Sequence, residues 1–566
     1  MRRMAGNGCG VVMMVAAFAL ALAAGACPGS VTGAGGGAGA GGGGPANSGG
    51  APANNDGWPA FAPTTAFQLR RLTTEQYVAS VQTLLGISAS GMPPVEGVSA
   101  AGGFSAIGAS TSAVSSAGVA QFEAAARFLA HAAFASDATR TKLVPCTPAG
   151  VGDTACFAKF VTAFGQRAFR RPLTADETTR YGAVAAQAAK DLSDPWQGME
   201  TITSAFLQSP NFIYLPEVGV PDPQRPARSR LTSYELASRL AYFLTNNTPD
   251  DVLLAAAAAD ALVTTAGVQT ETARLLALPA AHDAVRSFFG ALLALDNLDT
   301  LSRPVALFPQ FTPTLGAAMK QETTLAIDDL VFGSDGDYRH LFDQTETFVN
   351  AELAALYGLP APSAAGFSRV TLPPGAHRAG LLGQAGVLAA RDHADGTSPT
   401  RRGLFVLTRL LCQNLPLAPP ANLTIPPPPT GMITARQRLE QHASNAVCAS
   451  CHRQTDPVGL SLEHLDAMGV WRDTDHGLPI DDTGTYGGQT FQGEVGLGAF
   501  LRDHPALSPC LIQSLYGVGV GHLPTEFDRD TFAALVGGFA GNASHVRALL
   551  AAIAASDGFR YTPRPN

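Results

Sequence analysis

The chain has 566 residues, more than one hydrophobic core usually organises, so several folded units are expected. Hydrophobic residues make up 46% of it and charged residues 14%, with a formal net charge of -8, which excludes a chain disordered throughout and a broadly basic surface. Nucleic acid is therefore not expected as a partner, because binding to phosphate needs such a surface.

The start of the chain is typical of a bacterial export signal. Arg2 and Arg3 precede an apolar run that ends in small residues before Cys27. The run is shorter than the roughly 20 residues of a transmembrane helix. We predict a signal peptide at 1–27 and acylation of Cys27, which resembles a lipobox cysteine, with free secretion as the alternative. The mature protein would then sit in the cell envelope, periplasmic or surface-exposed, on a Gly-rich linker at 28–57.

Helix-start signals recur in the folded part. Capping boxes begin at Thr73, Thr174 and Thr232, each followed by apolar residues at helical spacing. The pattern predicts a mainly α fold of serial helical domains with a small C-terminal cytochrome c-like module. The expected helical domains are 67–135, 146–217, 230–359 and 490–560.

Four cysteines suit structural disulfides. Cys146 and Cys156 flank a short loop, and an oxidising compartment favours a bond between them. Cys412 and Cys510 could form a second bond, with two buried thiols as the alternative. A proline-rich stretch at 415–429 then separates the helical body from the next motif.

The strongest chemical signal is the run C-x-x-C-H at residues 448–452, which follows a helix capped at Thr434. Two thiols one helical turn apart can add to the vinyl groups of haem, and the next histidine can bind the iron. We therefore predict haem c, attached through Cys448 and Cys451 with His452 as the proximal iron ligand. The alternatives are a disulfide between the two cysteines or a four-thiolate zinc site with Cys412 and Cys510.

The sixth iron ligand is less defined by sequence. Met468 is the nearest thioether after the motif, and it could reach the iron if Pro457 and Gly459 interrupt the helix and let the chain fold back. The other options are an open iron or one of the nearby histidines His442, His464 and His476. Trp471 and Arg472 could pack on the haem edge and pair with a propionate, or form an ordinary aromatic and arginine pair.

Six blocks in order resemble a known family of large exported bacterial proteins. The blocks are RRLTTEQYVASVQTLLG, FGQRAFRRPLTADE, LQSPNFIY, RLTSYELASRLAYFLTNNTPDD, GLLGQAGVLAARDHADGTSPTRRGLFVLTRLLC and CASCHRQTDPVGLSLEHLDAMGVWR. The family has domains of unknown function 1587, 1595, 1592, 1588 and 1585 in series, with a planctomycete-type cytochrome c segment. The resemblance covers residues 67–560, implies a haem c-binding segment at 377–475 and gives no substrate. Thr455 stands where the family usually has Met, Ile or Leu.

These features favour an exported haem c redox protein, engaged in electron transfer or in haem-dependent oxidoreduction on an unknown substrate. Its partner would be a redox protein or a small molecule. The alternative is a surface-anchored binding or scaffold protein with a structural cysteine pair or zinc site. Motifs of serine hydrolases, P-loop NTPases, zinc proteases and dinucleotide-binding enzymes are missing from the sequence in a suitable context, and the sequence leaves open whether the protein is an enzyme.

Overall fold

The structure is a computed structural model that describes residues 61, 69–415, 433–444 and 446–564. The predicted signal peptide at 1–27, Cys27, the linker at 28–57 and most of the proline-rich stretch lie outside these residues. Within the described ranges, no helix combines the length and the apolar character that a membrane span requires.

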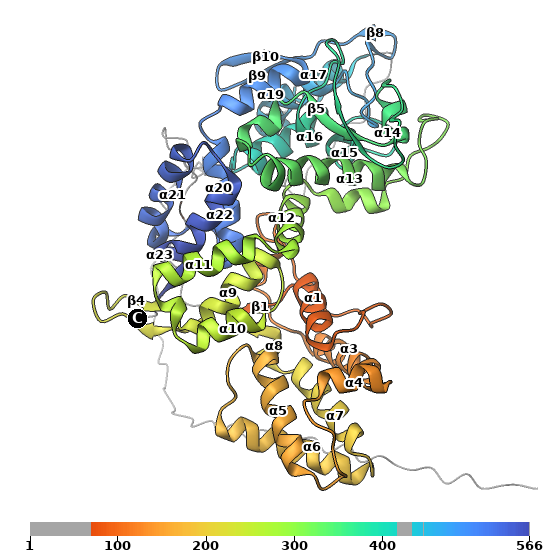
Figure 1. Ribbon diagram of the computed structural model, residues 1–566. Coiled ribbons are helices and arrows are strands. Elements are labelled where there is room, and N and C mark those ends of the chain that lie inside the picture. The colour runs from red at the N-terminus through yellow and green to blue at the C-terminus, as the bar shows by residue number, and fades with distance from the viewer. Residues whose placement is uncertain (1–60, 62–68, 416–432, 445, 565–566) are drawn as a thin grey trace, which may run out of the picture. The chain divides into compact units, whose positions relative to one another are not determined.

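The fold is mainly α, as predicted: the structure is 58% helical and its sheets are small and antiparallel. In the first region, residues 69–215, helices α3, α5, α6 and α7 pack together (Figure 1). The elements of this region are β1 (Arg70–Arg71), α1 (Thr74–Leu85), α2 (Ser105–Gly108), α3 (Ser116–Phe134), α4 (Asp137–Leu143), α5 (Thr154–Phe169), α6 (Ala175–Asp191), α7 (Pro195–Leu207), α8 (Pro210–Ile213) and β2 (Tyr214–Leu215).

Local signals explain where these helices begin. The predicted capping boxes at Thr73 and Thr174 are present at the starts of α1 and α6. The apolar faces of α1, α3, α5 and α7 form one hydrophobic core, and β1 pairs with β2 to bring the two ends of the region together. The predicted disulfide between Cys146 and Cys156 is confirmed.

The middle of the chain continues with short helices and strand pairs. Its elements are β3 (Val220–Pro221), β4 (Arg228–Arg230), α9 (Ser233–Thr245), α10 (Asp251–Ala258), η1 (Ala261–Val263), α11 (Thr265–Leu276), α12 (Pro279–Leu292), η2 (Leu295–Thr300), α13 (Leu315–Asp328), η3 (Asp329–Gly333), η4 (Tyr338–Phe342), β5 (Glu346–Val349), α14 (Ala351–Leu356), β6 (Ser368–Thr371), η5 (Leu381–Gly383), α15 (Ala385–Ala389), α16 (Pro399–Phe405) and η6 (Val406–Leu410). The predicted capping box at Thr232 begins α9.

The last part, residues 433–564, packs against segments from earlier in the chain. Its elements are α17 (Ala435–His442), α18 (Ala446–Gly459), η7 (Leu460–Leu462), β7 (Thr474–Asp475), β8 (Leu478–Pro479), β9 (Thr483–Tyr486), β10 (Gln489–Gln492), α19 (Gly493–Asp503), α20 (Leu507–Val520), η8 (Glu526–Asp528), α21 (Arg529–Gly541), α22 (Val546–Ala555), α23 (Asp557–Arg560) and β11 (Tyr561–Pro563). Strand β11 pairs with β4, and one hydrophobic core includes residues from Leu231 to Phe559 together with Phe104 and Ile107 of the first region. The predicted disulfide between Cys412 and Cys510 is confirmed and ties the end of η6 to α20.

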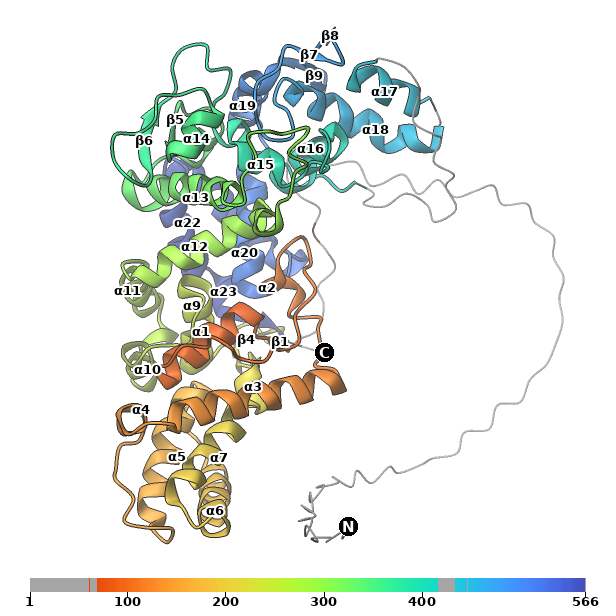
Figure 2. The ribbon, with the colours of Figure 1, turned by 90° about the vertical axis from the view of Figure 1, so that its right-hand side faces the viewer.

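One local prediction is wrong. Pro457 was expected to interrupt the helix after the C-x-x-C-H run, but it lies inside α18, which continues to Gly459. A proline removes one backbone hydrogen bond from a helix. The helix survives this loss because α18 packs closely along α16 (Figure 2).

Candidate functional site

The C-x-x-C-H run lies on α18. Cys448 is buried and Cys451, one turn further along, is partly exposed. Both are free thiols, whereas the other four cysteines of the described residues are joined in two disulfides. The motif thus has two thiols on one helix that form no disulfide, while the remaining described cysteines pair with each other.

His452 is held by hydrogen bonds from two elements. Its Nδ1 lies 2.8 Å from Oδ2 of Asp456, one turn later on α18. The other oxygen of Asp456 accepts a hydrogen bond from the Thr400 hydroxyl at the start of α16, at 2.8 Å. The bond to the carboxylate raises the pKa of His452. Because Nδ1 is engaged, Nε2 is the nitrogen that can bind a metal ion, an arrangement common around metal-bound histidines.

Two glycines allow α16 and α18 to approach closely. A side chain built on Gly403 would place its Cβ 1.9 Å from the carbonyl oxygen of Thr455. One built on Gly459 would lie 1.8 Å from the carbonyl oxygen of Pro399. Only glycine fits at either position, and the close crossing brings Thr400 within reach of His452 and Asp456.

A buried ionic network fixes α16 against the segment that follows α18. Arg402 is fully buried, pairs with Asp392 at 2.5 Å and donates to three backbone carbonyls just after α18. Burial is the largest single influence and disfavours its charge, but Asp392, Glu463 and Asp466 together outweigh it and raise the pKa of Arg402. Glu463 accepts from Thr397 and Arg472, each at 2.9 Å, while burial raises the pKa of its carboxyl.

Three aromatic rings stack beside this network. The indole of Trp471 lies between the imidazoles of His464 and His377, with centroid distances of 4.3 and 4.2 Å. The indole N–H donates to Asp473 at 3.0 Å. His377 adopts a left-handed backbone conformation, with φ of 53°. The pairing of Trp471 and Arg472 with a haem edge and propionate stays a prediction.

The residues named as possible sixth ligands lie in different environments. Met468 is completely buried in the hydrophobic core. The ring of His442, at the end of α17, is in edge contact with that of His452, with centroids 4.7 Å apart. His464 belongs to the ring stack, and the exposed His476 bonds to Asp475.

The sequence predicted the motif but missed the residues that hold it. The distance of four residues between His452 and Asp456 could have indicated their contact, since such pairs share a helix face. Nothing local pointed to Thr400 or to the pair of Asp392 and Arg402. In the described residues no group of three or more His, Cys, Asp or Glu side chains is arranged to hold a metal ion. The bond between Cys412 and Cys510 also removes both thiols from the four-thiolate zinc alternative.

Four family models match the chain in series, each described as a protein of unknown function. They are PSD3 (DUF1587) at residues 70–135, PSD5 (DUF1595) at 156–217, PSD4 (DUF1592) at 231–359 and PSCyt3 (DUF1588) at 378–475. The chain therefore belongs to the multidomain, planctomycete-type cytochrome c family of unknown function, as the resemblance implied, with domains 1587, 1595, 1592 and 1588 matched in series. No curated protein and no solved structure matches it.

Proposed function

We propose that the protein is an exported redox protein that carries one haem c, attached to Cys448 and Cys451 with His452 as the proximal iron ligand. When bound, the haem would supply reversible one-electron chemistry. The observation that carries the proposal is the pair of free thiols beside a histidine whose Nδ1 is bonded to Asp456. The matched segment at 378–475, whose family name refers to cytochromes, supports the same assignment.

The residues around the motif have separate tasks in this proposal. The helix sets the spacing of the two thiols, and Asp456 with Thr400 orients the imidazole so that Nε2 faces away from both. Arg402 holds α16 in place, which keeps Thr400 in position. The external partner would be an electron donor or acceptor, or a small substrate.

Covalent haem is tested by staining. Protein made in a haem-maturing periplasm should keep haem stain on a denaturing gel and give the pyridine haemochrome spectrum of haem c. The double variant Cys448→Ala, Cys451→Ala should lose both signals. The matched control Cys146→Ser, Cys156→Ser removes two other cysteines and should stay coloured. A colourless wild type overturns the proposal.

The positioning role of Asp456 has its own test. Asp456→Asn and Thr400→Val should both keep the stain, because neither residue forms the thioether bonds. Each should change the visible and electron paramagnetic resonance spectra of the iron and its reduction potential, since the imidazole loses its charged or oriented partner. Asp191→Asn, at an exposed carboxylate on α6, is the control, because no part of the proposal involves it. Spectra identical to the wild type in both variants contradict this role.

The sixth ligand is tested with a substitution that preserves packing. Met468 is the proposed ligand, and its burial in the core means that binding requires the side chain to turn away from its present neighbours. Met468→Leu keeps nearly the same volume, so a changed spectrum and potential would report a lost ligand rather than unfolding. Met319→Leu, at another fully buried methionine, is the control. An unchanged spectrum leaves the iron open or bound to a histidine such as His442.

Export and anchoring form the last part of the proposal. Two disulfides in the described residues support an oxidising compartment. We expect acylated Cys27 to attach the protein to a membrane surface. Cys27→Ser should release it into the soluble fraction without loss of haem stain. A variant that stays equally membrane-associated excludes acylation of Cys27 as the anchor.

A further inference from the structure

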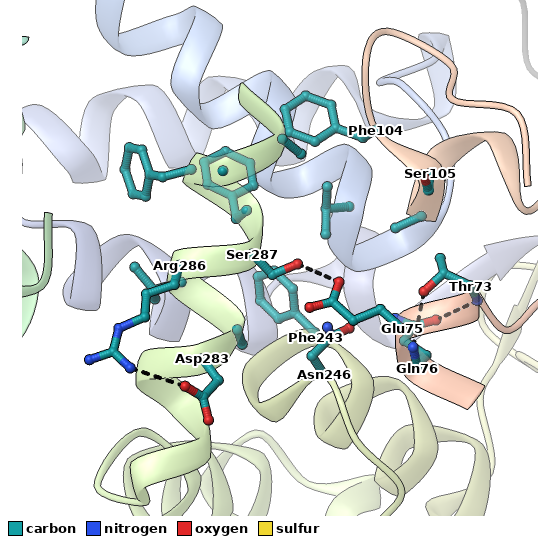
Figure 3. Close-up of a pocket in the computed structure, with 18 of the residues that line it drawn as sticks. Thr73, Glu75, Gln76, Phe104, Ser105, Phe243, Asn246, Asp283, Arg286 and Ser287 are labelled. Carbon is teal, nitrogen blue, oxygen red and sulfur yellow. Dashed lines mark hydrogen bonds and ion pairs between the residues drawn. The ribbon is translucent and has the colours of Figure 1, made fainter. Parts of the chain in front are cut away.

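A cleft of about 880 Å³ lies outside the C-x-x-C-H site (Figure 3). Segments distant in sequence line it: the start of α1, the end of α9, most of α12, and parts of α20 and α22. Its volume is in the range that holds a drug-sized organic molecule, and such cavities occur where several elements converge. It contains none of the residues assigned to haem.

The charged groups of the cleft leave one carboxylate without a cation. Lys320 pairs with Asp296 and Asp299, at 2.9 and 2.8 Å. Arg286 pairs with Asp283 at 3.1 Å and also with Asp328, beside the cleft.

Glu75 is different. It lies in the first turn of α1, is exposed to the cleft and accepts a hydrogen bond from the Ser287 hydroxyl at 2.7 Å. Among the described residues no Lys, Arg or His forms an ion pair with it. Ser287 fixes the carboxylate at the lip of the cleft, where Figure 3 shows the two side chains facing each other.

The wall behind Glu75 is apolar. Phe104 and Phe288 stack with ring centroids 5.2 Å apart, and Phe243 lies at the same cleft. A ligand that fits would therefore combine an apolar or aromatic body with a positively charged group. The apolar body gains from leaving water, and the cation can pair with Glu75.

Gly290 also lines the cleft. It lies inside α12, where glycine is less favourable than alanine. A Cβ built there has no heavy atom within 4 Å, so packing does not require glycine at this position. This contrasts with Gly403 and Gly459, which the crossing of α16 and α18 demands. The empty space above Gly290 is therefore available to a ligand.

We propose that this cleft binds a small organic cation, an ammonium group on an apolar or aromatic body, with Glu75 as its counter-ion and the phenylalanine wall as its apolar contact. The site is independent of the haem assignment. It gives the protein a ligand-binding activity whether or not Cys448 and Cys451 carry haem.

The proposal is tested with a matched pair of probes on the full chain. Tryptamine carries an ammonium group on an indole, and indole-3-propionate carries a carboxylate on the same ring. Saturation-transfer NMR and calorimetry should detect tryptamine, with indole-3-propionate at least about tenfold weaker. Glu75→Gln should remove this preference for the amine. Equal binding of both probes, or no binding of tryptamine at millimolar concentration, overturns the proposal.

A second variant tests the location. Gly290→Leu places a side chain in the open space of the cleft and should weaken tryptamine binding by about tenfold or more. Gly182→Leu, on α6, is the control, because its Cβ also has no heavy atom within 4 Å but lies outside the cleft. If both variants bind alike while their circular dichroism matches the wild type, the site lies elsewhere. The double variant Cys448→Ala, Cys451→Ala should keep tryptamine binding. The experiment therefore distinguishes a failure of the haem assignment from a failure of the proposed cation site.

Discussion

The first helical region and the segment around α16 and α18 are held together by different interactions. Residues 69–215 pack through aromatic rings: Phe206 is completely buried and stacks on Tyr181 at 4.3 Å, with Phe169 at 5.1 Å. The other segment depends on the buried ion pair of Arg402 with Asp392 and on glycines that bring two backbones together.

An apolar core and a buried ion pair differ in how strictly they fix the positions of the side chains that form them. Apolar cores accept many combinations of side chains of suitable volume. A buried ion pair is acceptable only when its hydrogen bonds are complete, so few arrangements satisfy it. The segment that carries His452, the iron ligand of our proposal, uses the stricter kind of interaction, and a metal ligand needs such a fixed position.

Removal of each disulfide in turn should give the largest changes in the free energy of unfolding. The bond between Cys412 and Cys510 closes a loop of 98 residues, and that between Cys146 and Cys156 a loop of 10. Loop-closure entropy predicts losses of about 4.7 and about 2.7 kcal/mol when each pair is replaced by serine. Urea unfolding of the two double variants measures the order, and a larger loss in the shorter loop contradicts it.

Arg402→Ala should destabilise the protein by about 3–5 kcal/mol, because it leaves Asp392 buried without its partner. The neighbouring Arg401 is exposed, so Arg401→Ala is a direct control with a change within about 0.5 kcal/mol. Urea unfolding measures both. Equal midpoints for the two variants show that the network does not stabilise the segment.

Gly403→Ala should cost about 1–3 kcal/mol, because the new Cβ would overlap the carbonyl of Thr455 and force the helices apart. Gly182→Ala, at an open helical position, should instead be neutral or stabilising by up to about 1 kcal/mol. Thermal unfolding distinguishes the signs. A stabilised Gly403→Ala protein shows that the two helices do not cross as closely as described.

The helices of the fold were predictable from sequence because their signals are local. Capping boxes at Thr73, Thr174, Thr232 and Thr434 all occur where the pattern placed them. The C-x-x-C-H run was also predictable, because the motif is defined by five consecutive residues of the sequence. Both disulfides were also predicted: Cys146 and Cys156 flank a short loop, and Cys412 and Cys510 remained once the motif was assigned to haem, with two buried thiols as the alternative.

The surroundings of the site were not predictable for a physical reason. Arg402 and Asp392 are ten residues apart, and the carbonyls that Arg402 binds lie sixty residues away, so no local pattern links them. Pro457 suggested a helix end by propensity, but tertiary packing on α16 kept the helix. Met468 is a second example, because its spacing from His452 in the sequence did not indicate that it is buried in the core.

The smallest expected effect is a pH dependence that extends the comparison to α19. Glu494 is buried, only one of its oxygens has a partner, and burial raises its pKa to about 8 in spite of nearby Arg378. Below pH 4.5, its ordinary pKa, the carboxyl is protonated in folded and unfolded chains alike. Between that value and about pH 8 only the folded chain keeps the proton, so the free energy of unfolding falls as pH rises, by up to about 1.4 kcal/mol per unit.

Glu494→Gln removes this ionisation, so the variant should gain stability relative to the wild type as pH rises from 5 to 8. Urea midpoints at several pH values give the slope. Glu526→Gln, at an exposed carboxylate, is the control and should follow the wild type. A difference between wild type and Glu494→Gln that stays constant from pH 5 to 8 contradicts a protonated Glu494. The aromatic core around Phe206 contains no such group, so Phe206→Leu should lower stability by the same amount at every pH in this range.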